Sequence, residues 1–276
     1  MTTLLQISDP HFGTERPAVV DALVRLVADQ APELVVLSGD ITQRATVEQF
    51  AAARRFVDRL AAPSLVVPGN HDVPLFDLVS RLLRPYARYR AAFGDELEPV
   101  HESPSWLVQG VRTTRRWRHE NGEVSAAQIA RVAARLEAAT PAQMRLVVVH
   151  QPVVVQSAVD AHAVLHRHEA AVRRWAAAGA DAIVGGHIHV PYVVPLHERY
   201  DGLVRPMWCV QAGTAVSDRV RQEAGNSVNV LRHDGSASVG AARRGIVERW
   251  DHDAAAGRFV RVATHPLSLD RSRRIG

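Results

Sequence analysis

The first seventy residues alternate between short apolar runs and segments with helical spacing, and this alternation restricts the chain to a small group of folds. The apolar runs are Thr3–Ser8, Leu34–Ser38 and Ser64–Val67. Between them, residues 17–30 and 46–60 place apolar side chains three and four positions apart, as in a helix that packs on one face. Continuous apolar runs of this length are typical of strands buried on both faces. We therefore predict an α/β fold with βαβ units and a largely parallel sheet.

The pattern changes twice further along the chain. Residues 73–122 are less regular, and we predict a helical and loop insertion near the active site, with a helix over 75–93 that Pro85 interrupts. Regular alternation then resumes, with helices predicted at 125–139 and 168–178 and strands at 106–111, 146–149 and 182–184. After Pro191, strand-like runs separated by turn residues predict a second, mostly antiparallel sheet; they cover 204–211, 227–233, 238–247 and 258–263. We expect one domain over residues 1–276.

Composition excludes several classes of protein. No stretch approaches the ~20 consecutive apolar residues of a membrane span. Cys209 is the only cysteine, which excludes an intrachain disulfide and a cysteine-based zinc site, and fits a reducing compartment. Because Met1 is followed almost at once by an apolar strand, we predict no signal peptide and a cytoplasmic location. The net charge of +4 suits an anionic substrate but is too small to indicate nucleic acid by itself.

Side chains suited to metal binding follow five of the predicted strands. They occur in the segments Asp9-Pro10-His11, Gly39-Asp40, Gly69-Asn70-His71-Asp72, His150 and Gly186-His187-Ile188-His189. In open α/β sheets the carboxyl ends of the strands converge on one crevice, so we expect these five segments to meet in space.

The residue types and spacings in these segments indicate two metal ions. The set offers carboxylate, amide and imidazole ligands without sulfur, which suits transition metals such as Fe, Mn or Zn. Asp40 has two oxygens, enough to bridge two cations, and seven ligands are too many for one ion. Asp9 and His11, like His187 and His189, lie two residues apart, which in an extended segment places both side chains on one side. Pro10 favours an extended conformation at Asp9.

Each segment taken alone has a simpler interpretation. A single D-x-H or H-x-H pair is more often a structural hydrogen-bonded pair, and G-N-H-D is a common turn sequence. A histidine such as His150 after an apolar strand is more often a core residue with satisfied hydrogen bonds. The metal interpretation depends on the order of the five segments and on their shared position at strand ends.

The order D-x-H, G-D, G-N-H-D, H, G-H-x-H resembles the signature of calcineurin-like metallophosphoesterases, and it spans Asp9 to His189. The resemblance implies a four-layer αββα sandwich, with two mixed β-sheets flanked by helices and a dinuclear metal site at the strand ends. It also implies two sets of ligands that share Asp40. One metal takes Asp9, His11, Asp40 and His189, and the other takes Asp40, Asn70, His150 and His187.

The resemblance also implies a catalytic role for His71, which in this family faces the phosphate, with Asp72 behind it to orient its ring. The compact length is similar to the class III cyclic-nucleotide phosphodiesterases and the glycerophosphodiesterase group. Those enzymes commonly carry a second histidine after the fifth-motif ligand, where this chain has Gln151.

These observations predict metal-dependent hydrolysis of a phosphoester by a metal-bridging hydroxide. A small phosphodiester is expected, with a 3',5'-cyclic nucleotide as the first candidate, because no arginine stands among the motif residues to meet the second charge of a monoester. A DNA or RNA nuclease and a phosphomonoesterase remain alternatives on the same scaffold. A non-catalytic metal-binding interaction scaffold is an alternative outside the enzyme class, but it should lack ligands, and none is missing here.

Arginines and histidines outside the motifs are weaker candidates. Arg112, Arg115, Arg116 and Arg118 surround Trp117 and could contact substrate at the mouth of the site, although a solvated loop is the simpler interpretation. His162, His166 and His168 could form an extra metal site, but a polar loop before a helix is the simpler interpretation here too. The basic residues of the tail, Arg271, Arg273 and Arg274, are expected to be disordered.

Overall fold

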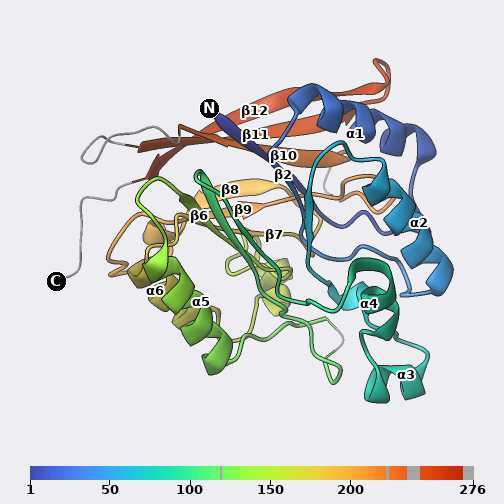
Figure 1. Cartoon of the computed structure of the whole chain (residues 1–276), viewed down its shortest axis with the longest axis horizontal. Helices are drawn as coiled ribbons and strands as arrows, with labels where there is room; N and C mark the ends of the chain where they lie inside the picture. Colours follow the sequence, from blue (N-terminus) through green and yellow to red (C-terminus); the bar gives the residue numbers. More distant parts are fainter. Residues whose placement is uncertain (119, 222–223, 235–242, 270–276) are drawn as a thin grey trace.

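The chain forms two six-stranded sheets packed face to face, with helices on both outer faces (Figure 1). The computed structural model describes residues 1–118, 120–221, 224–234 and 243–269. Three apolar cores separate the four layers: one under each pair of helices and one between the sheets. The predicted αββα sandwich with two mixed sheets is confirmed.

The first sheet has the strand order β12-β11-β10-β1-β2-β3. Its strands are β1 (Thr2–Ile7), β2 (Leu34–Leu37), β3 (Ser64–Val66), β10 (Ser227–His233), β11 (Arg243–Asp253) and β12 (Arg258–Leu269). The first three are parallel to one another, and the last three are antiparallel. Helices α1 (Pro17–Gln30) and α2 (Val47–Asp58) cover its outer face. The period of two is visible in β1, where Leu5 packs under the helices and Leu4 packs between the sheets.

The second sheet has the order β4-β5-β6-β7-β9-β8. Its strands are β4 (Val100–Glu102), β5 (Trp106–Gly110), β6 (Met144–Val148), β7 (Ala182–Gly185), β8 (Tyr192–Pro195) and β9 (Trp208–Gln211). The four central strands are parallel, and the edge strands β4 and β8 are antiparallel to their neighbours. Helices α5 (Ala126–Ala138) and α6 (His168–Ala178) cover the outer face (Figure 1).

The prediction of a separate antiparallel sheet after Pro191 is wrong. Strands β8 and β9 complete the second sheet, whereas β10, β11 and β12 extend the first sheet from β1. The register of β1 on β10 pairs Thr2 with His233, so the two ends of the chain build one sheet. Local sequence patterns predict where strands form but not which strands pair with each other. Pairing depends on which sheet edges remain unpaired once the core has formed. Residues 238–242 of one predicted strand, and the tail arginines, lie outside the described residues.

The segment 73–122 contains two short helices and two strands. Helices α3 (Leu78–Leu83) and α4 (Ala87–Phe93) lie on either side of Pro85, where the sequence predicts an interruption. Strands β4 and β5 then enter the second sheet. Three 3₁₀ helices complete the list of elements: η1 (Asn70–Asp72), η2 (Ala158–Ala163) and η3 (Leu196–Glu198). Among the described helices, none has the length and apolar character needed to cross a bilayer.

A buried polar network joins the two sheets just below the strand ends. The Gln6 amide nitrogen donates to Ser38 Oγ at 3.2 Å and to the Gly185 carbonyl at 2.9 Å, across the sheet interface. Asn229 Nδ2 in turn donates to Gln6 Oε1 at 3.0 Å. Because buried polar groups that are left unpaired are costly, these hydrogen bonds fix how the sheets sit on each other. They hold β2 and β7 together at the residues that precede the Gly39 and Gly186 segments.

Candidate metal centre

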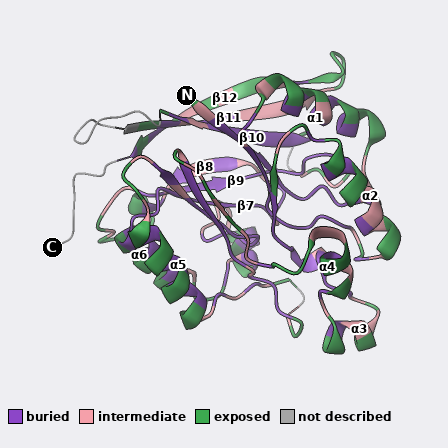
Figure 2. Ribbon diagram, in the orientation of Figure 1, coloured by how far each residue is buried: buried purple, intermediate pink, exposed green. Residues whose placement is uncertain are grey.

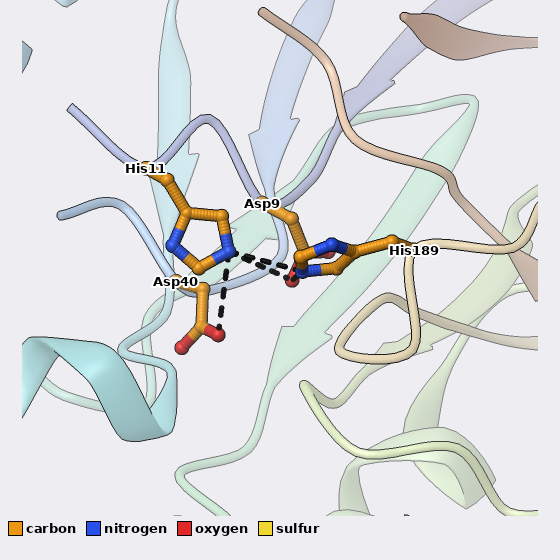
Figure 3. Close-up of side chains that lie close together, drawn as sticks. All are labelled: Asp9, His11, Asp40 and His189. Carbon is orange, nitrogen blue, oxygen red and sulfur yellow. Dashed lines mark hydrogen bonds and ion pairs between the residues drawn. The ribbon is translucent and has the colours of Figure 1, made fainter. Parts of the chain in front are cut away.

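The loops after β1, β2 and β7 bring four buried side chains into one cluster. Asp9, His11, Asp40 and His189 each offer a ligand atom within 4.8 Å of the others. Figure 3 shows their carboxylates and imidazoles pointing toward one another from separate loops. The shortest contact joins the Nε2 atoms of His11 and His189 at 3.0 Å. This group contains the same residues as the first predicted ligand set.

A second cluster adjoins the first and includes Asp40 again. Asp40, His150 and His187 have ligand atoms within 4.8 Å of one another. His150 Nε2 lies 3.1 Å from Asn70 Oδ1 and 3.1 Å from Asp40 Oδ1. The structure therefore brings together all seven side chains that the sequence proposed as ligands.

The two oxygens of Asp40 face different clusters. Oδ1 is 3.1 Å from His150 Nε2, whereas Oδ2 is 3.8 Å from His11 Nε2. The backbone N–H of His71 donates to Oδ1 at 2.8 Å, which fixes the orientation of the carboxylate. This geometry suits a carboxylate that bridges two cations.

The hydrogen bonds of the imidazoles show that the clusters fit metal ions. His150 Nδ1 and His189 Nδ1 each lie against a backbone carbonyl, Ser38 O at 2.9 Å and Arg219 O at 2.7 Å, so both must donate there. In a neutral ring, Nε2 then carries a lone pair. These lone pairs point at other acceptors, and the arrangement is repulsive unless a proton or a metal cation lies between them. Backbone carbonyls on the far nitrogen are also the usual partners of metal-bound histidines.

The charges of the buried groups depend strongly on one another. Burial opposes ionisation of Asp9, but His189 outweighs it and lowers the pKa of Asp9 to about 2. Burial also lowers the pKa values of His11 and His187 to about 3, so these rings are neutral and available as ligands. For His150, burial is outweighed by the carboxylate of Asp40, and its pKa rises to about 9. The same contact holds the pKa of Asp40 well below its usual range.

These pKa shifts predict that metal binding displaces a proton from His150. Its raised pKa means that the metal-free protein carries this proton at neutral pH, and a cation must replace it. Below pH ~9 the apparent affinity should therefore rise about tenfold per pH unit. Calorimetric titration of the metal-free protein with Mn²⁺ at pH 7, in two buffers of different ionisation enthalpy, should show about one proton released. Binding that is independent of pH between 6 and 8 would contradict this assignment.

The backbone at the ligands differs from the expected extended conformation. Asp9, His11, Asp40, His187 and His189 all have positive φ, between 43° and 77°. The extended geometry predicted for the two i, i+2 pairs, and for Asp9 before Pro10, is therefore wrong. Hydrogen bonds between the loops hold these turns, including Asp9 N to Gly39 O at 3.1 Å. Such conformations cost about 1–3 kcal/mol each and concentrate at functional sites.

Two of the motif glycines are required by close approach to the ligands. A Cβ on Gly69 would lie 2.2 Å from Asp40 Oδ1, and one on Gly186 would lie 2.2 Å from Asp9 Oδ2. Any side chain at either position would push a carboxylate out of its cluster. The backbone at these two glycines is therefore in close contact with ligand side chains.

The structure places His71 beside the clusters but gives it a different orienting partner. Its ring stacks edge-on against His11, with centroids 4.8 Å apart. Its Nδ1 donates to the Gln43 carbonyl at 2.9 Å, and its Nε2 accepts from Arg219 Nη1 at 3.3 Å on the cavity side of the ring. Asp72, predicted to orient this ring, instead accepts hydrogen bonds from backbone N–H groups of Ile41 and Gly69, and from Thr42. Burial raises the pKa of Asp72 to about 6, and its hydrogen bonds connect the loop after β3 to the loop after β2.

The arginine loop does not lie at the metal clusters. Arg115 is buried against Gln128, and Arg118 pairs with Glu123. Arg112 stacks over the Tyr86 ring, and Arg116 donates to the Leu82 carbonyl. Three of the four, Arg112, Arg115 and Arg116, line a separate groove beside α4, and none lines the cavity over the clusters. The substrate-contacting role proposed for these residues is therefore not supported by their position.

The histidines at positions 162, 166 and 168 have separate surroundings, in agreement with the simpler interpretation of a polar loop before a helix. His166 contacts Arg118 and His168 contacts the Tyr200 hydroxyl, whereas His162 lines the cavity over the metal clusters. No metal cluster forms from these three among the described residues.

A cavity of about 190 Å³ opens over the clusters, and sequence reasoning missed several residues on its wall. They are Glu120, Asp160, Arg219 and Arg221. Arg219 Nη1 lies 3.3 Å from His71 Nε2 and 3.1 Å from Gln43 Oε1. Arg221 is paired with Asp160 at 3.0 Å. These residues follow no motif and come from loops far apart in the sequence, so only folding reveals them.

Gln151, the departure from the family pattern, supports this wall indirectly. Its side chain accepts from the Thr113 hydroxyl and donates to the Glu120 carbonyl at 3.0 Å. It therefore holds the loop that carries Glu120, and it does not point at the clusters as a ligand.

Two curated proteins are similar to part of the chain. One is described as a probable cyclic nucleotide phosphodiesterase of Synechococcus sp., 26% identical over 81 residues, which is 26% of this chain and 32% of that protein. The other is the glycerophosphodiester phosphodiesterase GpdQ of Enterobacter lignolyticus, 32% identical over 80 residues, 25% of this chain and 29% of that protein. The matches span about a third of the length of these relatives.

Solved structures show the same fold at low sequence identity. A dimetal phosphatase from Danio rerio has a TM-score of 0.64 at 15% identity, covering 98% of this chain and 99% of its own. A purple acid phosphatase from yellow lupin seeds has a TM-score of 0.68 at 13% identity, covering 98% of this chain and 54% of its own. The family model for calcineurin-like phosphoesterases matches residues 2–191, which contain all five motifs and both clusters. The chain therefore belongs to the calcineurin-like phosphoesterase family.

Proposed function

We propose that this protein hydrolyses a small phosphodiester, with a 3',5'-cyclic nucleotide as the first candidate. The observation that carries the proposal is a pair of buried clusters that share Asp40 and open into one small cavity. Two divalent ions held there would supply a nucleophile from water near neutral pH and electrostatic stabilisation of the phosphoryl group. Fe, Mn and Zn all suit this oxygen and nitrogen ligand set.

The chain's own residues then have distinct tasks. His11, His150 and His189 are buried and His187 is half-buried, and all four imidazoles offer ligand atoms; the backbone carbonyls behind His150 and His189 fix their tautomers. His71 lines the cavity with Nδ1 held by the Gln43 carbonyl, and its Nε2, once protonated, would donate a proton to the leaving oxygen. Arg219 stands beside it and can bind a non-bridging phosphoryl oxygen.

The charge on the cavity wall supports a monoanionic substrate. The sequence argument considered only the motif residues, which contain no arginine, but Arg219 and Arg221 from outside the motifs both line the cavity. Arg221 is offset by its ion pair with Asp160. Glu120 adds a further negative charge on the wall. Arg219 is thus the one arginine on the described wall without an ion pair, and the carboxylates of Glu120 and Asp160 oppose the second negative charge of a monoester. Both curated relatives are described as phosphodiesterases, which agrees with a diester substrate.

Phosphomonoester hydrolysis is the second candidate, and Arg219 is the observation that favours it. A monoester carries a second negative charge, and a guanidinium near the metal clusters is a suitable partner for that charge.

Rates on matched substrates should distinguish these candidates. We expect kcat/KM of the Mn²⁺-loaded protein to be at least about tenfold higher for bis-aryl than for mono-aryl phosphate, or ~1.4 kcal/mol of discrimination. A tenfold preference for the monoester would overturn the diester proposal. Cyclic AMP should also be cleaved in preference to single-stranded DNA at both low and high salt. DNA cleavage that falls steeply with salt would indicate a nuclease.

An Arg219→Met variant adds a second arm to this comparison. The guanidinium should stabilise a bound dianion more than a bound monoanion. The variant's kcat/KM should therefore fall roughly tenfold or more for the monoester and by less for the diester. An equal loss on both substrates would mean that Arg219 binds an oxygen common to the two. Metal content should remain unchanged, because only the backbone carbonyl of Arg219 contacts a candidate ligand.

A further inference from the structure

Every exposed leucine, phenylalanine and tryptophan among the described residues lies on one surface around α3. These residues are Phe76, Leu78, Leu82, Leu83 and Trp117, with Val79 beside them. Their side chains are between 58% and 77% exposed. The other exposed large apolar residues are Met1 and scattered valines. Helix α3 lies at the edge of the molecule in Figure 1 and is mostly exposed in Figure 2. We call this group the α3 surface.

The α3 surface is held as one unit by Arg81. This buried guanidinium points inward and donates to the carbonyls of Arg116 at 2.7 Å, Arg118 at 2.8 Å and Pro74 at 3.1 Å. It thereby ties the loop that carries Trp117 to α3. On the outer side of the helix, Leu78 with Leu82 and Val79 with Leu83 are four residues apart and therefore share a face. The apolar side chains are thus presented outward by a fixed support.

Positive charge is concentrated around the same surface. Residues 74–90 and 112–118 contain eight arginines and one aspartate, whereas the whole chain carries a net charge of only +4. The rest of the chain is therefore net negative. Several of these arginines donate to backbone carbonyls, as Arg81 and Arg116 do, and such contacts leave the positive charge in place. Three of the eight arginines have a carboxylate partner, Arg88 in Asp77, Arg90 in Asp95 and Arg118 in Glu123, and the other five have no ion pair among the described residues.

This combination distinguishes between the possible partners. Nucleic acid would use the arginines but would leave five large apolar side chains in water. A second copy of the chain would bury the apolar side chains but would bring two arginine-rich rims together. An anionic bilayer would accommodate both the apolar side chains and the arginines. Leucine, phenylalanine and tryptophan enter the headgroup boundary, while arginine binds lipid phosphates. We propose that the α3 surface docks this protein onto an anionic phospholipid membrane. The proposal goes beyond the hydrolytic function and does not depend on it.

Vesicle co-sedimentation of the purified full chain tests the proposal. Binding to vesicles of phosphatidylcholine with 30% phosphatidylglycerol should exceed binding to pure phosphatidylcholine by at least about tenfold. The double variant Leu82→Ser/Leu83→Ser should lose at least about tenfold in affinity, because two apolar side chains no longer enter the boundary. Arg84→Gln should weaken binding less, and mainly at low salt.

The matched control is Val262→Ser, which removes an apolar side chain 50% exposed on β12. It should bind vesicles like the unchanged protein. All variants should keep the thermal unfolding midpoint, since the substituted side chains are exposed. Three results would overturn the proposal. The protein could show no preference for anionic vesicles, or the control variant could lose as much vesicle affinity as the double variant. The unchanged protein could also be a dimer that binds no vesicles, with the double variant a monomer. Salt-sensitive binding to DNA without binding to vesicles would instead assign the surface to nucleic acid.

Discussion

Replacing Asp40 by alanine is expected to abolish phosphoester hydrolysis and to lower the metal content of the purified protein. Asp40 is the only residue that belongs to both clusters, and its two oxygens face separate groups of ligands. Its loss removes a ligand from each cluster and the negative charge between them. Loss of several kcal/mol of metal-derived stabilisation corresponds to a fall of at least about 10³-fold in kcat.

Elemental analysis and steady-state rates on the same preparation check this expectation. Asp160→Ala is the matched control, because it removes a carboxylate that lines the cavity but belongs to neither cluster. It should retain the metal content of the unchanged protein. If Asp40→Ala retained full metal occupancy, the bridging assignment would be wrong. A normal far-ultraviolet circular dichroism spectrum should accompany the loss, since the sheets do not depend on this side chain.

Replacing His71 by alanine should affect chemistry while leaving the metal ions in place. The ring lies against His11 but belongs to neither cluster, and its Nδ1 is occupied by the Gln43 carbonyl. If Nε2 protonates the leaving oxygen, kcat should fall roughly 10²-fold or more for substrates with poor leaving groups. Activated aryl esters, whose leaving groups need little protonation, should lose less.

The dependence on the leaving group separates general-acid catalysis from a purely structural role. A plot of log kcat against leaving-group pKa should be steeper for His71→Ala than for the unchanged protein. His162→Ala is the matched control, because this histidine lines the same cavity and its Nδ1 lies against the Val159 carbonyl. It should leave the slope unchanged. Loss of metal from His71→Ala would make His71 a ligand instead, and an unchanged slope would mean that it only binds the phosphoryl group.

The two outcomes are also informative together. Asp40 acts through the metal ions and His71 acts beside them, so a deficit in metal should appear in one variant and not in the other. A double variant should be no slower than Asp40→Ala alone, because groups that act in one step are not additive once the first is removed.

Local sequence patterns were enough to identify the residues that form the metal clusters. Asp9, Asp40 and His150 each follow an apolar strand, and parallel strands present their carboxyl ends at the same edge of a sheet. The α/β class, the break at Pro85 and the seven candidate ligands all follow from such local patterns. These features can be predicted from short segments because strand burial and turn formation depend mainly on residues that are close in the sequence.

The residues that surround the clusters could be identified only from the folded structure. It placed Arg219 beside His71, although 147 positions lie between them in the chain, and it kept Arg112–Arg118 away from the cavity. It paired β10 with β1 and so added the last strands to the first sheet. It also imposed left-handed conformations on Asp9 and His187, against the extended geometry that their spacing suggested. These features depend on hydrogen bonds and packing between distant segments, and they take shape only when the two sheets come together.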